Sequence, residues 1–129
     1  MDQSVQLTPT DAELDVLKIL WQHGPCTVRF VHERLNKKRQ TGYTTTLKIM
    51  QIMFEKGIVI RNEESRTHIY EAMVGQDDIE KRLISKLMDS AFSGSASRLV
   101  MQVLGTRLPS ETELKAIKKL IRNLENGEK

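Results

Sequence analysis

Between residues 10 and 71, three short stretches with helical periodicity precede two β-prone runs, and few small folds accommodate that order. The first stretch runs from Asp11 to His23. Thr10 and Glu13 form a capping box at its start, and Gly24-Pro25 follows its last residue. These residues predict a helix whose two ends are fixed by the local sequence.

The second and third helical stretches are bounded in a similar way, and the β-prone runs follow them. Thr27 is placed to cap the second stretch, and Gly42 and Gly57 bound the third. The runs 58–61 and 67–71 flank a polar turn and are typical of a two-stranded hairpin. Three helices followed by a hairpin are the element order of a winged helix, which is a variant of the helix-turn-helix.

After Gly75 the pattern becomes entirely helical. We therefore predict a mainly α protein with a small β-hairpin, in which a winged helix-turn-helix domain spans 1–75 and three helices form a dimerisation domain over 76–129. A domain of fewer than ~60 residues buries a small share of its surface, so we expect the helices to meet a second copy. The alternative is that they fold back onto the first domain. The apolar residues expected at the dimer interface are Leu83, Leu87, Leu99, Val103, Ile117, Leu120, Ile121 and Leu124.

The chain carries 20 Lys and Arg residues against 17 Asp and Glu residues, but the charge is unevenly distributed. The segment from Arg29 to Lys48 holds a single acid, Glu33, and its other bases are Arg34, Lys37, Lys38 and Arg39. Such a segment suits binding to phosphates, with Arg29, Lys38 and Arg39 as candidates. The alternative is a basic loop that is simply solvated.

The third helical stretch has a polar face that can read DNA. On a helical wheel, Thr44, Lys48 and Gln51 lie opposite the apolar stripe, and Thr45 lies beside them. The N-terminal half of a recognition helix contacts base edges in the major groove. Threonine can contact the thymine methyl group, glutamine suits adenine, and lysine reaches guanine or phosphate. We therefore predict that these four residues bind DNA.

Several further residues have two interpretations each. Tyr43 either donates to a phosphate or packs half-buried at the start of its helix. Arg66 lies near the hairpin turn, where it either contacts DNA or balances the nearby Glu63 and Glu64. Arg61 lies on the first strand of the hairpin and is a further candidate for DNA contact. Phe30 lies opposite the apolar side of the second helix, where it either covers another part of the chain or lies against the DNA backbone.

Other classes of protein find little support in the sequence. No segment approaches the ~18 apolar residues of a membrane span, and the acidic N-terminus lacks the apolar core of a signal peptide. The single cysteine, Cys26, fits a cytoplasmic protein, and with His23 and His32 it gives too few ligands for a structural zinc site. No nucleophile motif or phosphate loop points to an enzyme. We expect no catalytic residues, no metal, no cofactor and no membrane insertion.

An ordered set of short motifs runs through almost the whole chain. In the first half these motifs are Leu7-Thr8-Pro9, Glu13-Leu14, Leu20-Trp21, Gly24-Pro25, Val28-Arg29 and His32-Glu33-Arg34-Leu35. Further along they are Tyr43-Thr44-Thr45, Leu47, Gln51, Lys56-Gly57, Arg61, Arg66, Tyr70, Phe92, Gly94 and Ser95. In this order they resemble the penicillinase repressors, the bacterial repressors of β-lactamase and methicillin-resistance genes. The resemblance implies a homodimeric winged-helix repressor that binds an inverted-repeat operator with its third helix in the major groove.

The same resemblance implies how repression ends. In the antibiotic-responsive members a membrane-bound sensor metalloprotease cleaves the C-terminal domain, within a helix that aligns with Leu99 to Val103. Those members have an Asn-Phe pair where this chain has Gln102-Val103, its candidate cleavage site. Ile52 and Phe30 also depart from the common pattern, which has a basic residue and an acidic or polar residue at these positions. These departures predict an operator of different sequence.

Two functions from other classes remain open. A winged helix can serve as a protein assembly module without DNA, and alanine at Lys48 and Arg66 would then leave function intact. A repressor can also sense a small molecule in a pocket between its two domains, although no polar cluster in the sequence points to such a pocket.

Overall fold

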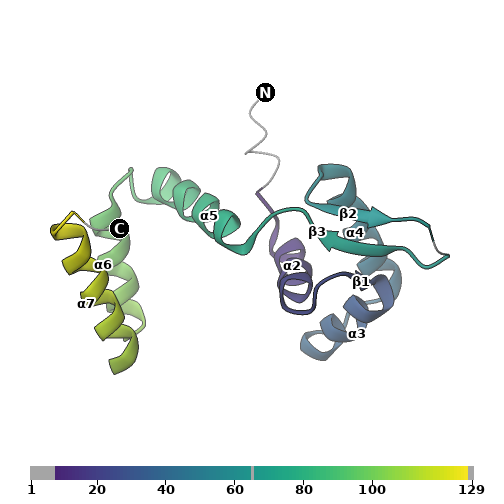
Figure 1. The fold of residues 1–129 in the computed structure, drawn as a ribbon, viewed down its shortest axis with the longest axis horizontal. Helices are drawn as coiled ribbons and strands as arrows, with labels where there is room; N and C mark the ends of the chain where they lie inside the picture. Colours follow the sequence, from purple (N-terminus) through teal and green to yellow (C-terminus); the bar gives the residue numbers. More distant parts are fainter. Residues whose placement is uncertain (1–7, 65, 128–129) are drawn as a thin grey trace. The chain divides into compact units, whose positions relative to one another are not determined.

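The structure is a computed structural model that describes residues 8–64 and 66–127 (Figure 1). Leu7 and the acidic start of the chain lie outside the described residues, as does Ser65 in the hairpin turn. With the labels of Figure 1, the elements are α2 (Asp11–His23), β1 (Cys26–Thr27), α3 (Val28–Lys38), α4 (Tyr43–Lys56), β2 (Val59–Asn62), β3 (Ile69–Ala72), α5 (Gln76–Ala91), α6 (Ala96–Thr106) and α7 (Glu111–Glu125). This order confirms the predicted fold class of helices with a small antiparallel sheet.

The chain divides into two compact units, Met1–Ser85 and Lys86–Lys129, which we call the N-terminal unit and the C-terminal unit. The division falls inside α5, whereas the sequence places the domain boundary at the start of the same helix.

The helices of the N-terminal unit begin where the sequence places their N-caps, and α2 and α4 end at the predicted glycines Gly24 and Gly57. Thr10 Oγ1 lies 3.2 Å from the Glu13 amide, and Glu13 Oε1 lies 2.9 Å from the Thr10 amide, so the capping box of α2 is complete. Thr27 Oγ1 accepts from the Phe30 N–H at 3.1 Å and opens α3. Gly57 ends α4 with a φ of 80°, a left-handed conformation that favours glycine.

The small sheet has one strand more than the sequence predicted. β2 and β3 form the expected antiparallel hairpin, with Arg61 opposite Tyr70. β1 pairs with the other edge of β3, where Cys26 lies opposite Tyr70, and the strand order is β1-β3-β2. A two-residue strand is too short to leave a periodic pattern in the sequence, so the prediction of a two-stranded hairpin was incomplete.

The core of the N-terminal unit lies between α2, α3, α4 and the sheet. Its fully buried side chains include Val16, Leu17, Val31, Met50, Met53, Ile58 and Tyr70. Lys56 Nζ lies 3.0 Å and 2.9 Å from the two carboxylate oxygens of the buried Glu13, which joins the end of α4 to the start of α2. The Trp21 indole N–H donates to the Val74 carbonyl at 2.8 Å and ties α2 to the segment before α5.

The helices of the C-terminal unit also have side-chain caps. Ser95 Oγ accepts from the Arg98 N–H at 3.2 Å at the start of α6. Ser110 and Glu113 form a second capping box at the start of α7. α6 continues through Gly105, where the sequence predicts a break, because one glycine inside a helix costs only about 1 kcal/mol relative to alanine.

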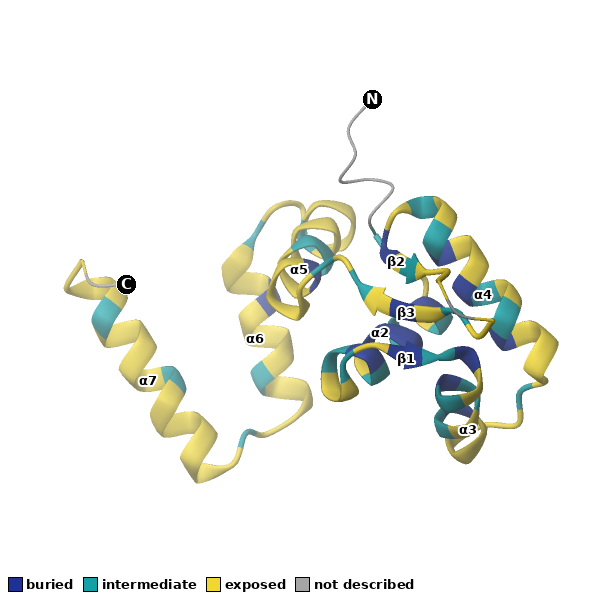
Figure 2. Ribbon diagram, turned by 45° about the vertical axis from the view of Figure 1, so that its right-hand side comes forward, coloured by how far each residue is buried: buried dark blue, intermediate teal, exposed yellow. Residues whose placement is uncertain are grey.

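The apolar faces of the C-terminal unit are largely open. Among its described residues only Leu99 is buried, and Figure 2 shows α6 and α7 as mostly exposed. Leu83, on the part of α5 in the N-terminal unit, and Ile117 are half-buried. The other residues predicted at the dimer interface are exposed, namely Leu87, Val103, Leu120, Ile121 and Leu124. In the described part of the chain no helix is both long and apolar enough to cross a membrane.

Candidate DNA-binding surface

A short, hydrogen-bonded turn connects α3 to α4 and makes the pair a helix-turn-helix. The Arg39 N–H donates to the Leu35 carbonyl at 3.1 Å and closes the end of α3. Asn36 Oδ1 accepts from the Thr41 N–H at 3.2 Å, and the Thr41 hydroxyl donates to the Arg39 carbonyl at 3.4 Å. α4 then begins after Gly42. The backbone of the turn is therefore fixed by its own side chains.

The inner side of the helix-turn-helix is held by a buried hydroxyl. Thr46 is fully buried, and its Oγ1 lies 3.2 Å from His32 Nδ1 and 3.5 Å from the Gly42 carbonyl oxygen. The His32 ring meets the Tyr43 ring edge-on, with 5.5 Å between centroids, and the Arg29 guanidinium lies 5.8 Å from the same Tyr43 ring. These contacts fix where α4 begins, while Tyr43 remains exposed on its other side.

The outer face of α4 is open to solvent along its first three turns. Thr44, Thr45, Lys48 and Gln51 are all exposed, and Ile52 is exposed beside them. Hydroxyl, ammonium and amide groups on one exposed helix face are the groups that bind base edges and phosphates. The structure brings together the four α4 residues that the sequence selects.

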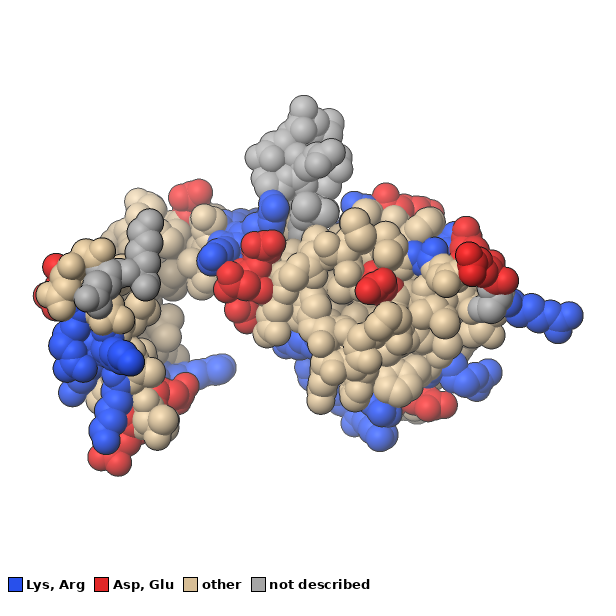
Figure 3. All heavy atoms as spheres, in the orientation of Figure 1, with Lys and Arg blue, Asp and Glu red and all other residues tan. Residues whose placement is uncertain are grey.

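Basic side chains continue this surface on both sides of α4. Figure 3 shows Lys and Arg side chains along the lower edge of the N-terminal unit, over α3, and at the outer end of the hairpin. Arg29 on α3 and Arg66 in the hairpin turn are both exposed. A duplex that met α4 would therefore find cations on either side of it.

Arg61 packs against Phe54 of α4 and does not extend from the wing, and its side chain is only 17% exposed. Its guanidinium lies 4.0 Å from the centroid of the Phe54 ring, and its Nη2 donates to Glu63 at 2.7 Å. Nη1 donates to the Tyr70 hydroxyl at 3.5 Å. The hydrogen bond to Tyr70, followed by that to Glu63, raises the pKa of the Arg61 guanidinium above its ordinary value. Arg61 therefore remains charged while it joins α4 to the wing.

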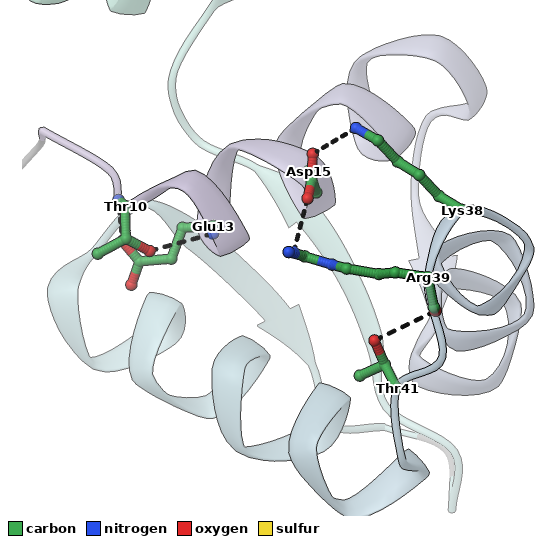
Figure 4. Close-up of polar contacts among 6 residues, drawn as sticks. All are labelled: Thr10, Glu13, Asp15, Lys38, Arg39 and Thr41. Carbon is green, nitrogen blue, oxygen red and sulfur yellow. Dashed lines mark hydrogen bonds and ion pairs between the residues drawn. The ribbon is translucent and has the colours of Figure 1, made fainter.

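Lys38 and Arg39 also have an acidic partner, which the sequence did not reveal. Lys38 Nζ lies 3.1 Å from Asp15 Oδ1, and Arg39 Nη2 lies 2.7 Å from Asp15 Oδ2 (Figure 4). Asp15 lies on α2 and is separated from the two bases by 23 and 24 positions in the chain. No local pattern connects such distant charges, and only the packing of α2 against α3 brings them together.

Phe30 covers another part of the chain, in agreement with one of its two interpretations. Its ring meets the His23 ring at the end of α2, with 5.1 Å between centroids and 73° between planes. The Arg34 guanidinium lies 4.2 Å from the centroid of the Phe30 ring. Phe30 is thus partly buried against the core and contacts the His23 ring edge-on and the Arg34 guanidinium.

The three soft side chains that could suggest a metal site have separate partners. Cys26 is buried and its thiol donates to the Gly24 carbonyl at 3.0 Å, while burial raises the pKa of this thiol and Arg34 opposes the shift. His32 faces Thr46, and His23 faces Phe30. Within residues 8–64 and 66–127, no group of three or more His, Cys, Asp or Glu side chains could hold a metal ion.

A three-helix unit with a helix-turn-helix and a β-hairpin wing defines the winged-helix class of proteins. A solved DNA-binding domain of the repressor BlaI superposes on it with a TM-score of 0.50 and 26% sequence identity, covering 54% of this chain and 85% of that domain. The sequence model of the penicillinase repressor family matches residues 9–123. The chain belongs to the penicillinase repressor family, a family of transcriptional repressors and not of enzymes.

Full-length relatives cover both units of the chain. The transcriptional regulator BlaI of Mycobacterium tuberculosis is 30% identical over 118 residues, which are 91% of this chain and 85% of that protein. The penicillinase repressor of Bacillus licheniformis is 21% identical over 93% of this chain and 94% of its own length. The methicillin resistance regulatory protein MecI of Mammaliicoccus sciuri is 18% identical over 87% of this chain and 91% of its own length.

Proposed function

We propose that this chain represses transcription as a homodimer that binds an inverted-repeat operator in double-stranded DNA and occludes a promoter. Each protomer inserts α4 into a major groove, and the half-sites lie one or more helical turns of about 10 base pairs apart. The protein acts in the cytoplasm, and genes for antibiotic resistance are candidate targets, because members of its family are named for penicillinase and methicillin resistance.

The exposed polar face of α4, within a family match that spans residues 9–123, is the observation that carries this proposal. We assign base contacts to Thr44, Thr45, Lys48 and Gln51, and phosphate contacts to Arg29, Tyr43 and Arg66. Lys38, Arg39 and Arg61 are further cations of the same surface, although each is paired with a carboxylate of the chain itself. Two half-sites read by two copies of α4 supply the symmetry of an inverted repeat.

The open apolar faces of the C-terminal unit support the homodimer. Leu120, Ile121 and Leu124 lie on one stripe of α7 and are exposed in the single chain. Soluble proteins rarely leave contiguous apolar faces open, and a second copy of the same face covers them most simply.

We further propose that repression ends by cleavage in α6, at Gln102-Val103, by a membrane-bound sensor metalloprotease. Both residues are exposed, and they lie in the middle of the helix. Cleavage there would remove α7 and the end of α6 from the dimer interface. Mass spectrometry of the protein after co-expression with such a protease and its inducer tests this step. An intact chain would point to a different release signal, such as the binding of a small molecule.

A DNA titration tests the proposed function directly. Labelled DNA from upstream of the gene for this protein is titrated by fluorescence anisotropy, beside a scrambled duplex and at two salt concentrations. We expect tight, salt-sensitive binding that prefers the upstream DNA. Lys48→Ala should weaken this binding by about 1–3 kcal/mol if Lys48 contacts a base, or lower the salt slope by about 1 if it contacts a phosphate.

Lys18→Ala is the matched control, because it removes the same charge from an exposed position on α2. Equal binding to both duplexes would leave a generic DNA-binding protein. No binding to either duplex at low salt would overturn the repressor and favour a winged-helix module for protein assembly.

A further inference from the structure

Two cations of the turn that precedes α4 are already held by a carboxylate of the same molecule. Lys38 is the last residue of α3, and Arg39 is its C-cap. Both side chains reach back to Asp15 on α2, where each carboxylate oxygen accepts from one of them (Figure 4). Asp15 therefore engages two of the positive charges that the turn could offer to DNA.

Asp15 is the fixed member of this cluster and the two bases are its mobile members. The Asp15 side chain is 13% exposed, whereas those of Lys38 and Arg39 are 66% and 51% exposed. A carboxylate on a packed helix keeps its position, while long side chains in water exchange partners readily. A single exposed ion pair contributes only about 0–1 kcal/mol, but Asp15 is largely covered and pairs with two bases at once, so it competes with a DNA phosphate for both of them.

Hydrogen bonds fix the backbone around Arg39, so only its side chain can move. The Arg39 N–H is bonded to the Leu35 carbonyl, and the Arg39 carbonyl accepts from the Thr41 hydroxyl. Thr41 is in turn bonded to Asn36. Rotation of the two basic side chains away from α2 therefore needs no rearrangement of the helix-turn-helix.

We propose that Asp15 is a positioning residue that competes with the DNA backbone for Lys38 and Arg39. By holding both bases on α2, it lowers the affinity for every duplex without changing the contacts that read sequence. The proposal rests on the proposed DNA-binding function. It predicts that one carboxylate of the chain, that of Asp15, controls whether Lys38 and Arg39 neutralise phosphates.

The test is a salt titration with a random-sequence duplex, measured by anisotropy for the wild type and Asp15→Asn. Each additional phosphate contact steepens the slope of log affinity against log salt by about 0.9, so release of both bases steepens it by about 1.8. The gain in affinity of Asp15→Asn should therefore be about 12-fold larger at about 50 mM than at about 200 mM salt. An unchanged slope would overturn the role of Asp15.

Asp77→Asn is the matched control for the change in net charge. Asp77 pairs with Lys81 at 3.0 Å, and both side chains are exposed on α5. This variant also replaces a paired aspartate by asparagine, but it releases no base at the turn. Its salt slope should equal that of the wild type. An increase as large as that of Asp15→Asn would mean that net charge alone explains the effect, which would overturn the proposal.

A double variant of the two bases completes the thermodynamic cycle. Lys38→Gln with Arg39→Gln should leave the salt slope of the wild type nearly unchanged, because Asp15 already withholds both charges. In the Asp15→Asn background the same double variant should abolish the gain. If the double variant instead flattens the slope by about 1.8 while Asp15 is present, both bases contact phosphate beside Asp15 and the proposal fails.

Two further readouts separate failure of the fold from failure of the proposal. The fluorescence of Trp21, the single tryptophan, reports whether Asp15→Asn retains the packing of α2. The double variant changes only exposed side chains and tests the proposal even where Asp15→Asn is unstable. If the wild type itself binds no DNA at low salt, the proposed function fails, whereas an unchanged Asp15→Asn overturns only the role of Asp15.

Discussion

The two units of the chain differ in what covers their apolar side chains. In the N-terminal unit Leu17, Met50 and Tyr70 are fully buried among helices and sheet. In the described part of the C-terminal unit only Leu99 is buried (Figure 2), although α7 carries apolar side chains at helical spacing, such as Leu120 and Leu124. A periodic pattern therefore shows that a helix has an apolar face, but not which partner covers it.

The polar contacts of the two units also differ, in how far apart along the chain the bonded residues lie. In the N-terminal unit Lys56 and Glu13 are joined across 43 positions, and Trp21 and Val74 across 53. The described side-chain hydrogen bonds of α6 and α7 are helix caps and one contact between the Ser95 and Ser97 hydroxyls, and each spans three positions or fewer. The N-terminal unit is thus closed by its own long-range contacts, and we expect the C-terminal unit to be closed by a second copy.

The largest effect is expected for a substitution that disrupts the dimer contacts of the C-terminal unit and leaves the N-terminal unit intact. Leu120 is 54% exposed, and Leu120→Glu should remove the burial of two half-covered leucines from a symmetric dimer, about 2–3 kcal/mol. Two buried carboxylates add several kcal/mol more. The dimer dissociation constant should rise at least about 100-fold in sedimentation velocity, while the unfolding transition followed by Trp21 fluorescence stays unchanged.

Lys119→Gln is the control for Leu120→Glu, since it makes the same change in net charge on the same helix and should leave the dimer intact. A Leu120→Glu protein that remains dimeric would exclude this face of α7 from the interface.

The next largest effect concerns how much the ion pair between α2 and α4 stabilises the N-terminal unit. The Glu13 side chain is 5% exposed and that of Lys56 is 34% exposed, so the two members of the ion pair are not equivalent. Lys56→Met leaves a buried carboxylate without its cation and should lower the free energy of unfolding by about 3 kcal/mol. Glu13→Gln should lower it less, by about 1.5 kcal/mol, because Lys56 can reach water. Urea denaturation followed by Trp21 fluorescence measures both.

Lys81→Met supplies the reference for this pair of variants, because its partner Asp77 is exposed and the loss should be near zero. The reverse order, with Glu13→Gln the more damaging, would show that the capping box and not the ion pair stabilises this corner.

The smallest effects are expected for substitutions in the two capping boxes, one in each unit. Thr10→Ala and Ser110→Ala each remove a hydroxyl that accepts from an amide, at 3.2 Å and 3.1 Å, and each should cost about 1 kcal/mol. Thr10→Ala should shift the Trp21 unfolding transition at every protein concentration. Ser110→Ala should instead weaken the dimer, so its effect should depend on concentration. Equal, concentration-independent shifts from both would mean that the units do not unfold separately.

Local sequence predicted most of the fold and the centre of the candidate surface. Thr10, Thr27, Gly42 and Gly57 place the ends of α2, α3 and α4 within the first unit, because caps act over three or four residues. The wheel of α4 also selected its exposed polar residues, since helical periodicity alone separates its two faces. β1 escaped prediction because its two residues become a strand only when β3 lies beside them.

The sequence by itself thus determined the helices, the hairpin, the N-caps of the helices and the exposed polar face of α4. Only the tertiary structure decided what Lys38 and Arg39 do, because their partner Asp15 is 23 and 24 positions away in the chain. Lys38 and Arg39 meet Asp15 through the packing of α2 against α3, and Arg61 joins Phe54 and Glu63 where the wing meets α4. Helical periodicity and caps act within a few residues, whereas the partner of a charge is set by which elements pack together.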